Sequence, residues 1–235
     1  MKQLNYYIIG LLAIVLWPVT SLSQEPDANK ILDEVQGKFL KIKDYEASIT
    51  IKVDVDFIKI PVKTGTAWFA QPDKVKVKTD GFSLLPKKGM NFSPNQLFTG
   101  DFTALYSGEE ELNGIPVYVI KVIPKDDTDD ILISKLWIDK NRKVIRRLES
   151  TTRSQGTFEM NFSFPPTAAE YDLPDAIVFN FDLRKNEIPL GLTGDFNNKD
   201  PKSSKGGRNT RGTVIIHYLK YIINQGKGLV PFSDK

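Results

Sequence analysis

The chain has 235 residues, of which 40% are hydrophobic and 26% charged, and its formal net charge is +3. These values exclude a chain that is disordered throughout, and the even dispersal of basic among acidic residues argues against a nucleic-acid partner. The absence of cysteine excludes disulfides, thiolate metal sites, cysteine nucleophiles and an acylated N-terminal cysteine.

Residues 1–23 have the three parts of a secretory signal peptide. Lys2 supplies a positive start, an apolar run covers 6–19, and Ser21-Leu-Ser23 offers small residues for cleavage. The alternative, an uncleaved membrane anchor, is disfavoured because the run is short and broken by glycine and proline. We therefore expect cleavage near Ser23 and a periplasmic protein, with 24–235 forming one domain.

The mature chain begins with a predicted amphipathic helix over 28–42. Asp27 or Asn29 can cap its start. One stripe at helical spacing is apolar and consists of Ile31, Val35, Phe39 and Ile42. Such a helix is expected to lie on a hydrophobic face of the rest of the protein.

Residues 45–79 predict adjacent antiparallel strands. Every odd position from Tyr45 to Val55 is apolar or aromatic, and the even positions are polar or charged. Because successive strand side chains point to opposite faces, one face of this strand is apolar. The segment 64–70, a Gln-Pro-Asp turn and the alternating run 74–78 continue the same pattern.

The rest of the chain is also predicted to be strand and turn. Further strands are expected over 117–123, 131–138, 143–150, 158–164, 177–183 and 214–223. Residues 81–86 predict a loop or short helix, and 97–106 show no clean period. The composition of 184–212 is rich in Gly, Asn, Lys and Ser, which predicts a flexible loop.

Few residues are suited to catalysis or to holding a cofactor. The only histidine, His217, falls inside a predicted strand, so no Ser-His-Asp arrangement is indicated. The acidic run 126–130 lacks the glycine and distal glutamate of a calcium-binding loop and predicts a polar turn. We expect no enzyme activity, no metal and no cofactor.

The alternating lysines of 74–78 allow two interpretations. They can form the solvated face of a strand, or a cationic surface for an acidic partner. Three spaced charges attract only weakly over distance, which favours the solvated face.

The predicted sheet carries more apolar side chains than one helix can cover. Either they fill an ordinary core, or the sheet curls around a hollow that holds an apolar ligand. The residues alone leave these alternatives open. From alternation, the candidates to line such a hollow are Ile49, Ile51, Val53, Val55, Trp68, Val75, Val77, Phe179 and Phe181.

The order of several short segments resembles a known family. These are the helix end Phe39-Leu-Lys-Ile-Lys-Asp-Tyr45, the run Gly65-Thr-Ala-Trp-Phe-Ala-Gln-Pro-Asp-Lys-Val-Lys-Val77, the hairpin segments 136–140 and 144–147, and the closing segments 221–226 and 230–232. Together they resemble the LolA-like family, the periplasmic carriers of outer-membrane lipoproteins.

The resemblance implies a mainly β (α+β) fold: a curved, incompletely closed antiparallel β-barrel covered by an N-terminal helix and short lid helices or loops. It also implies that the hollow shelters lipoprotein acyl chains or lipid. Lys76, or alternatively Lys74, matches the position of a basic residue, usually arginine, that holds the lid. The resemblance also implies a monomer that works with an inner-membrane donor protein and an outer-membrane acceptor protein. The alternative is a regulatory or sensing module that uses the same fold to bind a protein or peptide.

Overall fold

The structure is a computed structural model that describes residues 25–55, 58–59, 61–79, 100–126, 128, 130–154, 156–167, 170–183 and 210–233. The predicted signal segment 1–23, the predicted loop 81–86 and residues 184–209 of the predicted flexible loop lie outside these ranges.

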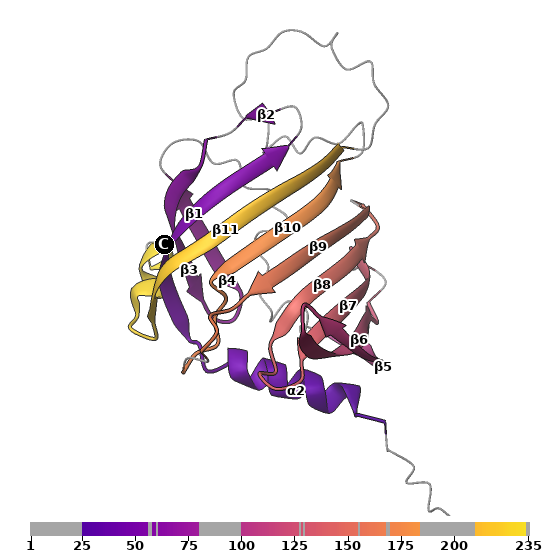
Figure 1. The fold of residues 1–235 in the computed structure, drawn as a ribbon. Helices are drawn as coiled ribbons and strands as arrows, with labels where there is room; N and C mark the ends of the chain where they lie inside the picture. The colour runs from indigo at the N-terminus through magenta and orange to yellow at the C-terminus, as the bar shows by residue number, and fades with distance from the viewer. Residues whose placement is uncertain are drawn as a thin grey trace, which may run out of the picture.

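The described residues form one antiparallel sheet and one α-helix (Figure 1). The strands are β1 (Asp44–Val55), β2 (Ile58–Lys59), β3 (Lys63–Ala70), β4 (Lys74–Thr79), β5 (Phe102–Leu112), β6 (Ile115–Pro124), β7 (Ile131–Asp139), β8 (Ile145–Thr152), β9 (Gly156–Ser163), β10 (Ala176–Leu183) and β11 (Thr210–Ile223). Their order is β4-β3-β1-β11-β10-β9-β8-β7-β6-β5, and β2 pairs with β1. No pairing among the described strands joins β4 to β5, so the curved sheet stays open. This confirms the predicted mainly β fold, an incompletely closed antiparallel barrel with an N-terminal helix.

Helix α2 (Ala28–Phe39) lies across one end of the curved sheet (Figure 1). The Asp27 carboxylate accepts from the backbone N–H of Asn29 at 2.9 Å and caps the helix. The helix ends three residues before the predicted Ile42, because the chain tightens there into i→i+3 bonds from Lys41 and Ile42. No helix in the described part of the chain is long and apolar enough to cross a membrane.

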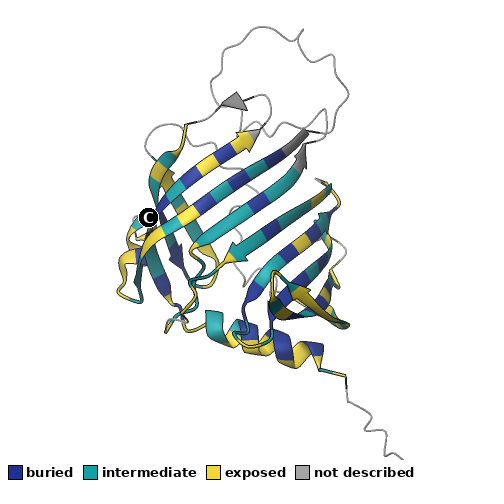
Figure 2. Ribbon diagram, viewed as in Figure 1, coloured by how far each residue is buried: buried dark blue, intermediate teal, exposed yellow. Residues whose placement is uncertain are grey.

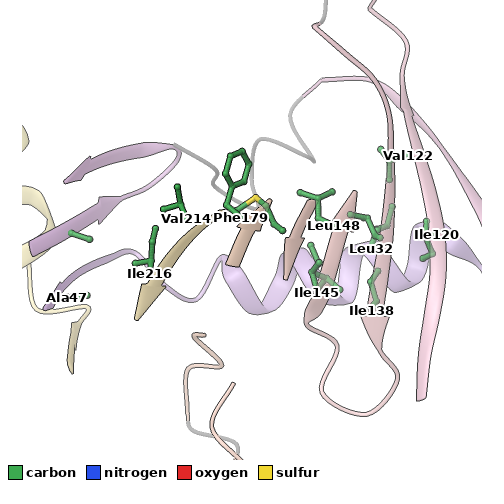
Figure 3. Packing of buried hydrophobic residues seen from close by; sticks show 14 of the residues in the cluster. Leu32, Ala47, Ile120, Val122, Ile138, Ile145, Leu148, Phe179, Val214 and Ile216 are labelled. Carbon is green, nitrogen blue, oxygen red and sulfur yellow. The ribbon is translucent and has the colours of Figure 1, made fainter. Parts of the chain in front are cut away.

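The alternation of β1 decides which face of the sheet is apolar. Ala47, Ile49, Ile51 and Val53 are buried, whereas Ser48, Lys52 and Asp54 are exposed (Figure 2). We call the face that carries the odd-numbered β1 side chains the inner face and the opposite one the outer face. Buried residues of α2 pack on the inner face, and Figure 3 shows Leu32 of α2 close to Leu148.

β5 occupies a segment whose sequence has no regular period. The register between β5 and β6 shifts between Tyr106 and Gly108, where Gly108 has φ 118°. This β-bulge follows the segment. Within that segment, Phe102, Ala104 and Tyr106 pack against the core, but the apolar Leu105 between them is 46% exposed, which hides the alternation in the sequence. The turn that follows contains Asn113 and Gly114, both with positive φ, as a tight hairpin requires.

β11 begins at Thr210, four residues before the predicted start, so the predicted loop does not extend to Gly212. Gly212 pairs with Phe181 across β10 and β11. A Cβ at position 212 would lie 2.4 Å from Cζ of Phe181, so the aromatic ring lies directly over the glycine. β11 can therefore continue through Gly212, although the composition of residues 184–212 had predicted a loop there.

Substituting Gly212 tests this close contact. We expect Gly212→Ala to lower the free energy of unfolding by about 1–3 kcal/mol, because the Phe181 ring must move. Gly37→Ala in α2 is the matched control. Beyond its own helix backbone, nothing lies within 4 Å of the methyl group that this alanine would add, so it should stabilise by up to about 1 kcal/mol. Urea unfolding measures both, and a neutral Gly212→Ala would contradict the packing described.

Candidate ligand-binding cavity

A cavity of about 130 Å³ lies on the inner face of the sheet. Its walls come from α2, from β1, β3, β4 and β8–β11, and from the connector between β9 and β10, of which residues 164–167 and 170–175 are described. Figure 3 shows Phe179 and Val214 beside each other on β10 and β11. The apolar lining residues are Val35, Phe39, Ile42, Ile49, Ala67, Phe69, Val75, Val77, Val144, Ile145, Met160, Phe162, Phe164, Leu173, Pro174, Ile177, Phe179, Val214 and Ile216. The polar ones are Lys38, Tyr45, Lys143, Asp172, Tyr218 and Tyr221.

The structure brings part of the predicted lining set to this cavity. Ile49, Val75, Val77 and Phe179 line it. Ile51 and Val53 belong to the hydrophobic core on the same face, and Phe181 packs against that core. The side chain of Val55 lies outside the described part of the structure.

Trp68 does not line the cavity. Its neighbours Ala67 and Phe69 do, and the opposite residue on β1 is Glu46. The Trp68 indole N–H donates to Glu46 Oε2 at 2.7 Å on the outer face. Trp68 was assigned to the hollow from alternation, which gives the period of a strand but not which of its faces turns inward. Its pairing with Glu46 sets Trp68 on the outer face.

Lys76 contacts a helix through a backbone carbonyl, but not over the cavity. Its ammonium donates to Pro231 O at 3.3 Å, within the 3₁₀-helix η1 (Lys227–Phe232). The buried Asp44 carboxylate accepts from the backbone N–H groups of Gly226 and Gly228. Lys76 and Asp44 both belong to the outer face, so η1 packs there. The expected lid contact is corrected accordingly: Lys76 fastens the C-terminal helix to the outside of the sheet.

Three tyrosines line the cavity: Tyr45, Tyr218 and Tyr221. Tyr45 belongs to the predicted apolar row of β1, whereas the sequence reasoning did not select Tyr218 or Tyr221. Tyr218 and Tyr221 are three positions apart and would face opposite ways in a regular strand. The register of β1 with β11 shifts between Ser48 and Ile49, leaving Leu219 as the extra residue. This bulge turns both rings inward, and alternation alone could not have found it.

The tyrosine rings form one packed group. Tyr218 stacks on Tyr221 at 5.2 Å between centroids, and Tyr221 meets Tyr45 edge-on at 5.3 Å. Burial raises the pKa of Tyr218 to about 12 and raises the pKa of Tyr45 and of Tyr221 well above the ordinary value. All three hydroxyls therefore remain protonated across the neutral range.

A polar cluster ties α2 to the connector beside the cavity. The Asp172 carboxylate, 8% exposed, pairs with Arg142 Nη2 at 2.5 Å and with Lys38 Nζ at 2.9 Å. Lys38 also donates to the carbonyl of Arg142. Burial acts to raise the pKa of Asp172, but hydrogen bonds from Arg142 and Lys38 outweigh it and hold the pKa below the ordinary value.

The residues of the cavity favour binding over chemistry. His217 is exposed on β11 and does not line the cavity. In the described ranges, no three His, Asp or Glu side chains lie close enough together to hold a metal ion. What the arrangement offers is a mostly apolar hollow with a few hydroxyl and charged groups near α2 and the connector.

No protein-family model matches the chain, and no curated protein sequence matches it. Among solved structures, it is similar to a DUF1329 family protein from Desulfovibrio piger, with a TM-score of 0.54 at 12% identity over 88% of this chain and 97% of that one. It also matches a LolA superfamily protein from Nitrosomonas europaea, with a TM-score of 0.48 at 11% identity over 83% and 93% of the two chains. A third match is a putative outer membrane lipoprotein-sorting protein domain from Vibrio parahaemolyticus, with a TM-score of 0.46 at 12% identity over 85% and 94%.

At these identities the likeness shows the fold alone, and of these three matches only the first is close enough to carry weight. The architecture that the resemblance to the LolA-like family implied, an open curved sheet with an N-terminal helix, is the one observed.

Asp172→Asn tests the polar cluster between α2 and the connector. We expect a loss of about 2 kcal/mol in the free energy of unfolding at pH 7, because Arg142 and Lys38 lose their charged partner. The folded-state pKa of Asp172 is lowered, so its contribution is complete above the unfolded pKa and is lost as the pH falls through the folded one. The two unfolding curves should therefore converge in acid.

Glu109→Gln is the control for this variant. Its carboxylate pairs with Lys140 at 2.7 Å but is 49% exposed, and exposed pairs contribute at most about 1 kcal/mol. Equal losses in the two variants, or a difference between Asp172→Asn and the native chain that persists unchanged in acid, would contradict the role assigned to Asp172.

Proposed function

We propose that this protein is a non-enzymatic periplasmic carrier that binds the acyl chains of a lipoprotein, or another lipid, in the inner-face cavity. The observation that supports this most directly is the cavity itself, walled by apolar side chains from seven strands and α2. A filled interior would have favoured the interaction module that binds a protein or peptide. The expected export signal in residues 1–23 supports the periplasmic location.

The volume of the cavity indicates how much ligand it holds in this conformation. A water-sized group occupies about 10–15 Å³ on this measure, so 130 Å³ accommodates on the order of ten such groups. That corresponds to one acyl chain of medium length. A cargo with several chains would require the walls to move apart.

The energetics are those of a reversible carrier. Each buried methylene contributes about 0.8 kcal/mol, so ten contribute about 8 kcal/mol before the costs of association. Losing translational freedom and ordering the chain cost at least about 4 kcal/mol. The remaining affinity is modest, which suits a cargo that a donor delivers at the inner membrane and an acceptor removes at the outer membrane.

The polar contacts around the cavity provide a route for such movement. α2 and the connector between β9 and β10 close one end of the hollow, and Asp172 joins them through side-chain bonds to Lys38 and Arg142. Breaking a few polar contacts separates these walls without unpairing any strand of the sheet.

A cavity-filling variant tests the proposal. Val77 lines the cavity from β4, at the edge of the sheet. We expect Val77→Trp to occupy the hollow and lower the affinity for a fluorescent apolar probe at least about 10-fold, since the indole displaces several methylenes worth about 0.8 kcal/mol each. Titration of delipidated protein with 1-N-phenylnaphthylamine measures this.

The matched control is Lys78→Trp on the same strand. Lys78 is exposed on the outer face, so this variant adds the same side chain without entering the cavity and should bind the probe like the native protein. Undiminished probe binding by a folded Val77→Trp variant would show that the ligand does not occupy this cavity and would sink the proposal.

A further inference from the structure

The tyrosine group gives the cavity a polar region on one side of an otherwise apolar lining. Tyr45 belongs to the start of β1, directly after the turn that follows α2, and Tyr221 lies against the connector. Ile216 and Val214 on β11, and Phe179 opposite Val214 on β10, lie further from the start of β1 than Tyr218 does and also line the cavity. An elongated ligand in the cavity therefore meets hydroxyl groups near α2 and apolar side chains beyond them.

Counting protons shows that the pair Tyr45 and Tyr218 has one hydrogen-bond donor to spare. The Tyr221 O–H donates to Pro174 O at 2.7 Å. The Tyr45 and Tyr218 hydroxyls hydrogen-bond to each other, and this bond uses one of their two protons. Each phenol has only one proton to give, so one proton of this pair has no acceptor among the described residues. Tyr218 lies opposite Ile49, further from the start of β1 than Tyr45, and is therefore the hydroxyl nearer the apolar part of the cavity.

The spare donor is held in place. Tyr218 is fixed by stacking on Tyr221 with an interplanar angle of 8°, and Tyr45 stacks on Phe69 at 5.3 Å. Tyr218 lines the cavity, so its free hydrogen-bonding capacity is available to a ligand there. A buried donor without a partner carries a desolvation cost, which a ligand oxygen would recover.

We propose that the Tyr218 hydroxyl donates a hydrogen bond to the acyl oxygen of the bound ligand, so that the cavity takes a single acyl chain with its carbonyl or carboxyl end near α2 and its hydrocarbon along Ile216, Phe179 and Val214. This rests on the proposed function and adds the class and the orientation of the ligand.

The surrounding charges agree with an oxygen acceptor rather than a cationic group. Lys38 and Lys143 both line the cavity near α2. Asp172, the acidic residue of the lining, already serves Lys38 and Arg142, and Glu34 pairs with Lys143 at 3.2 Å. A protonated amine would add a positive charge next to two lysines, whereas an acyl oxygen meets a donor and a favourable potential.

The test compares three probes of equal chain length on delipidated full-chain protein: dodecanoic acid, methyl dodecanoate and dodecane. Each displaces 1-N-phenylnaphthylamine, and the displacement gives its affinity. Tyr218→Phe keeps the ring and removes the hydroxyl. We expect it to weaken the acid and the ester about 2- to 10-fold, the range for one lost hydrogen bond, and to leave dodecane unchanged.

Two further variants make the result specific. Tyr106→Phe removes a hydroxyl from a ring outside the cavity lining, so it should change none of the three affinities. Tyr45→Phe removes the bond that orients Tyr218 and should weaken the acid and ester less than Tyr218→Phe does. If Tyr218→Phe fails to fold, the affinities of Tyr45→Phe for the three probes still test the proposal.

The outcomes separate the two proposals. A loss confined to the acid supports the subsite with a free fatty acid as ligand, and a loss for both acid and ester supports it with an esterified chain. Equal affinities of native protein and both Tyr218→Phe and Tyr45→Phe for all three probes would overturn the role of Tyr218 and leave the carrier proposal standing. If the native protein binds none of the probes, the proposed function fails as well.

Discussion

β1 is hydrogen-bonded to β3 on one side and to β11 on the other, and its alternation fixes the apolar face of the sheet around it. The odd-numbered side chains from Tyr45 to Val53 all point inward, so this face of β1 has to be buried. The neighbouring strands follow because a register slip of one residue would turn their apolar side chains outward. A long open sheet with one apolar face has to cover that face. In the described part of the chain α2 covers one end of it, and the cavity lies beside the helix.

The departures from regular strand geometry shape the cavity as much as the alternation does. The bulge in β11 brings Tyr218 and Tyr221 to the same face and supplies the hydroxyls of the lining. The glycine at position 212 admits the ring of Phe181 and lets β11 continue. On the opposite face, Asp44 and Lys76 hold η1 by backbone groups. The inner face is thereby left for ligand, and the C-terminal helix stabilises the wall from outside.

Strand alternation predicted most of the sheet and part of the site, and its failures have physical causes. The inward row of β1 and the lining positions Val75, Val77 and Phe179 followed from a period of two. The first half of β5 was left unassigned because the apolar Leu105 lies on its exposed side and hides that period. Trp68 was misplaced because alternation does not say which face of a strand turns inward. Tyr218 and Tyr221 were missed because a bulge cannot be read from one sequence. Asp172 bonds to Lys38 of α2 and to Arg142, which is 30 positions away in the sequence. Contacts between residues so far apart in the chain depend on the fold and could not be predicted from local sequence patterns.

The account depends on the inner-face cavity holding an acyl chain in the cell. The direct measurement is native mass spectrometry of the protein purified from its own periplasm under mild conditions, followed by solvent extraction and identification of any bound molecule. The account predicts a mass excess corresponding to one acyl-bearing molecule per chain, which extraction removes. Protein recovered without bound lipid, which after purification also takes up no acyl-bearing molecule from lipid vesicles, would contradict it.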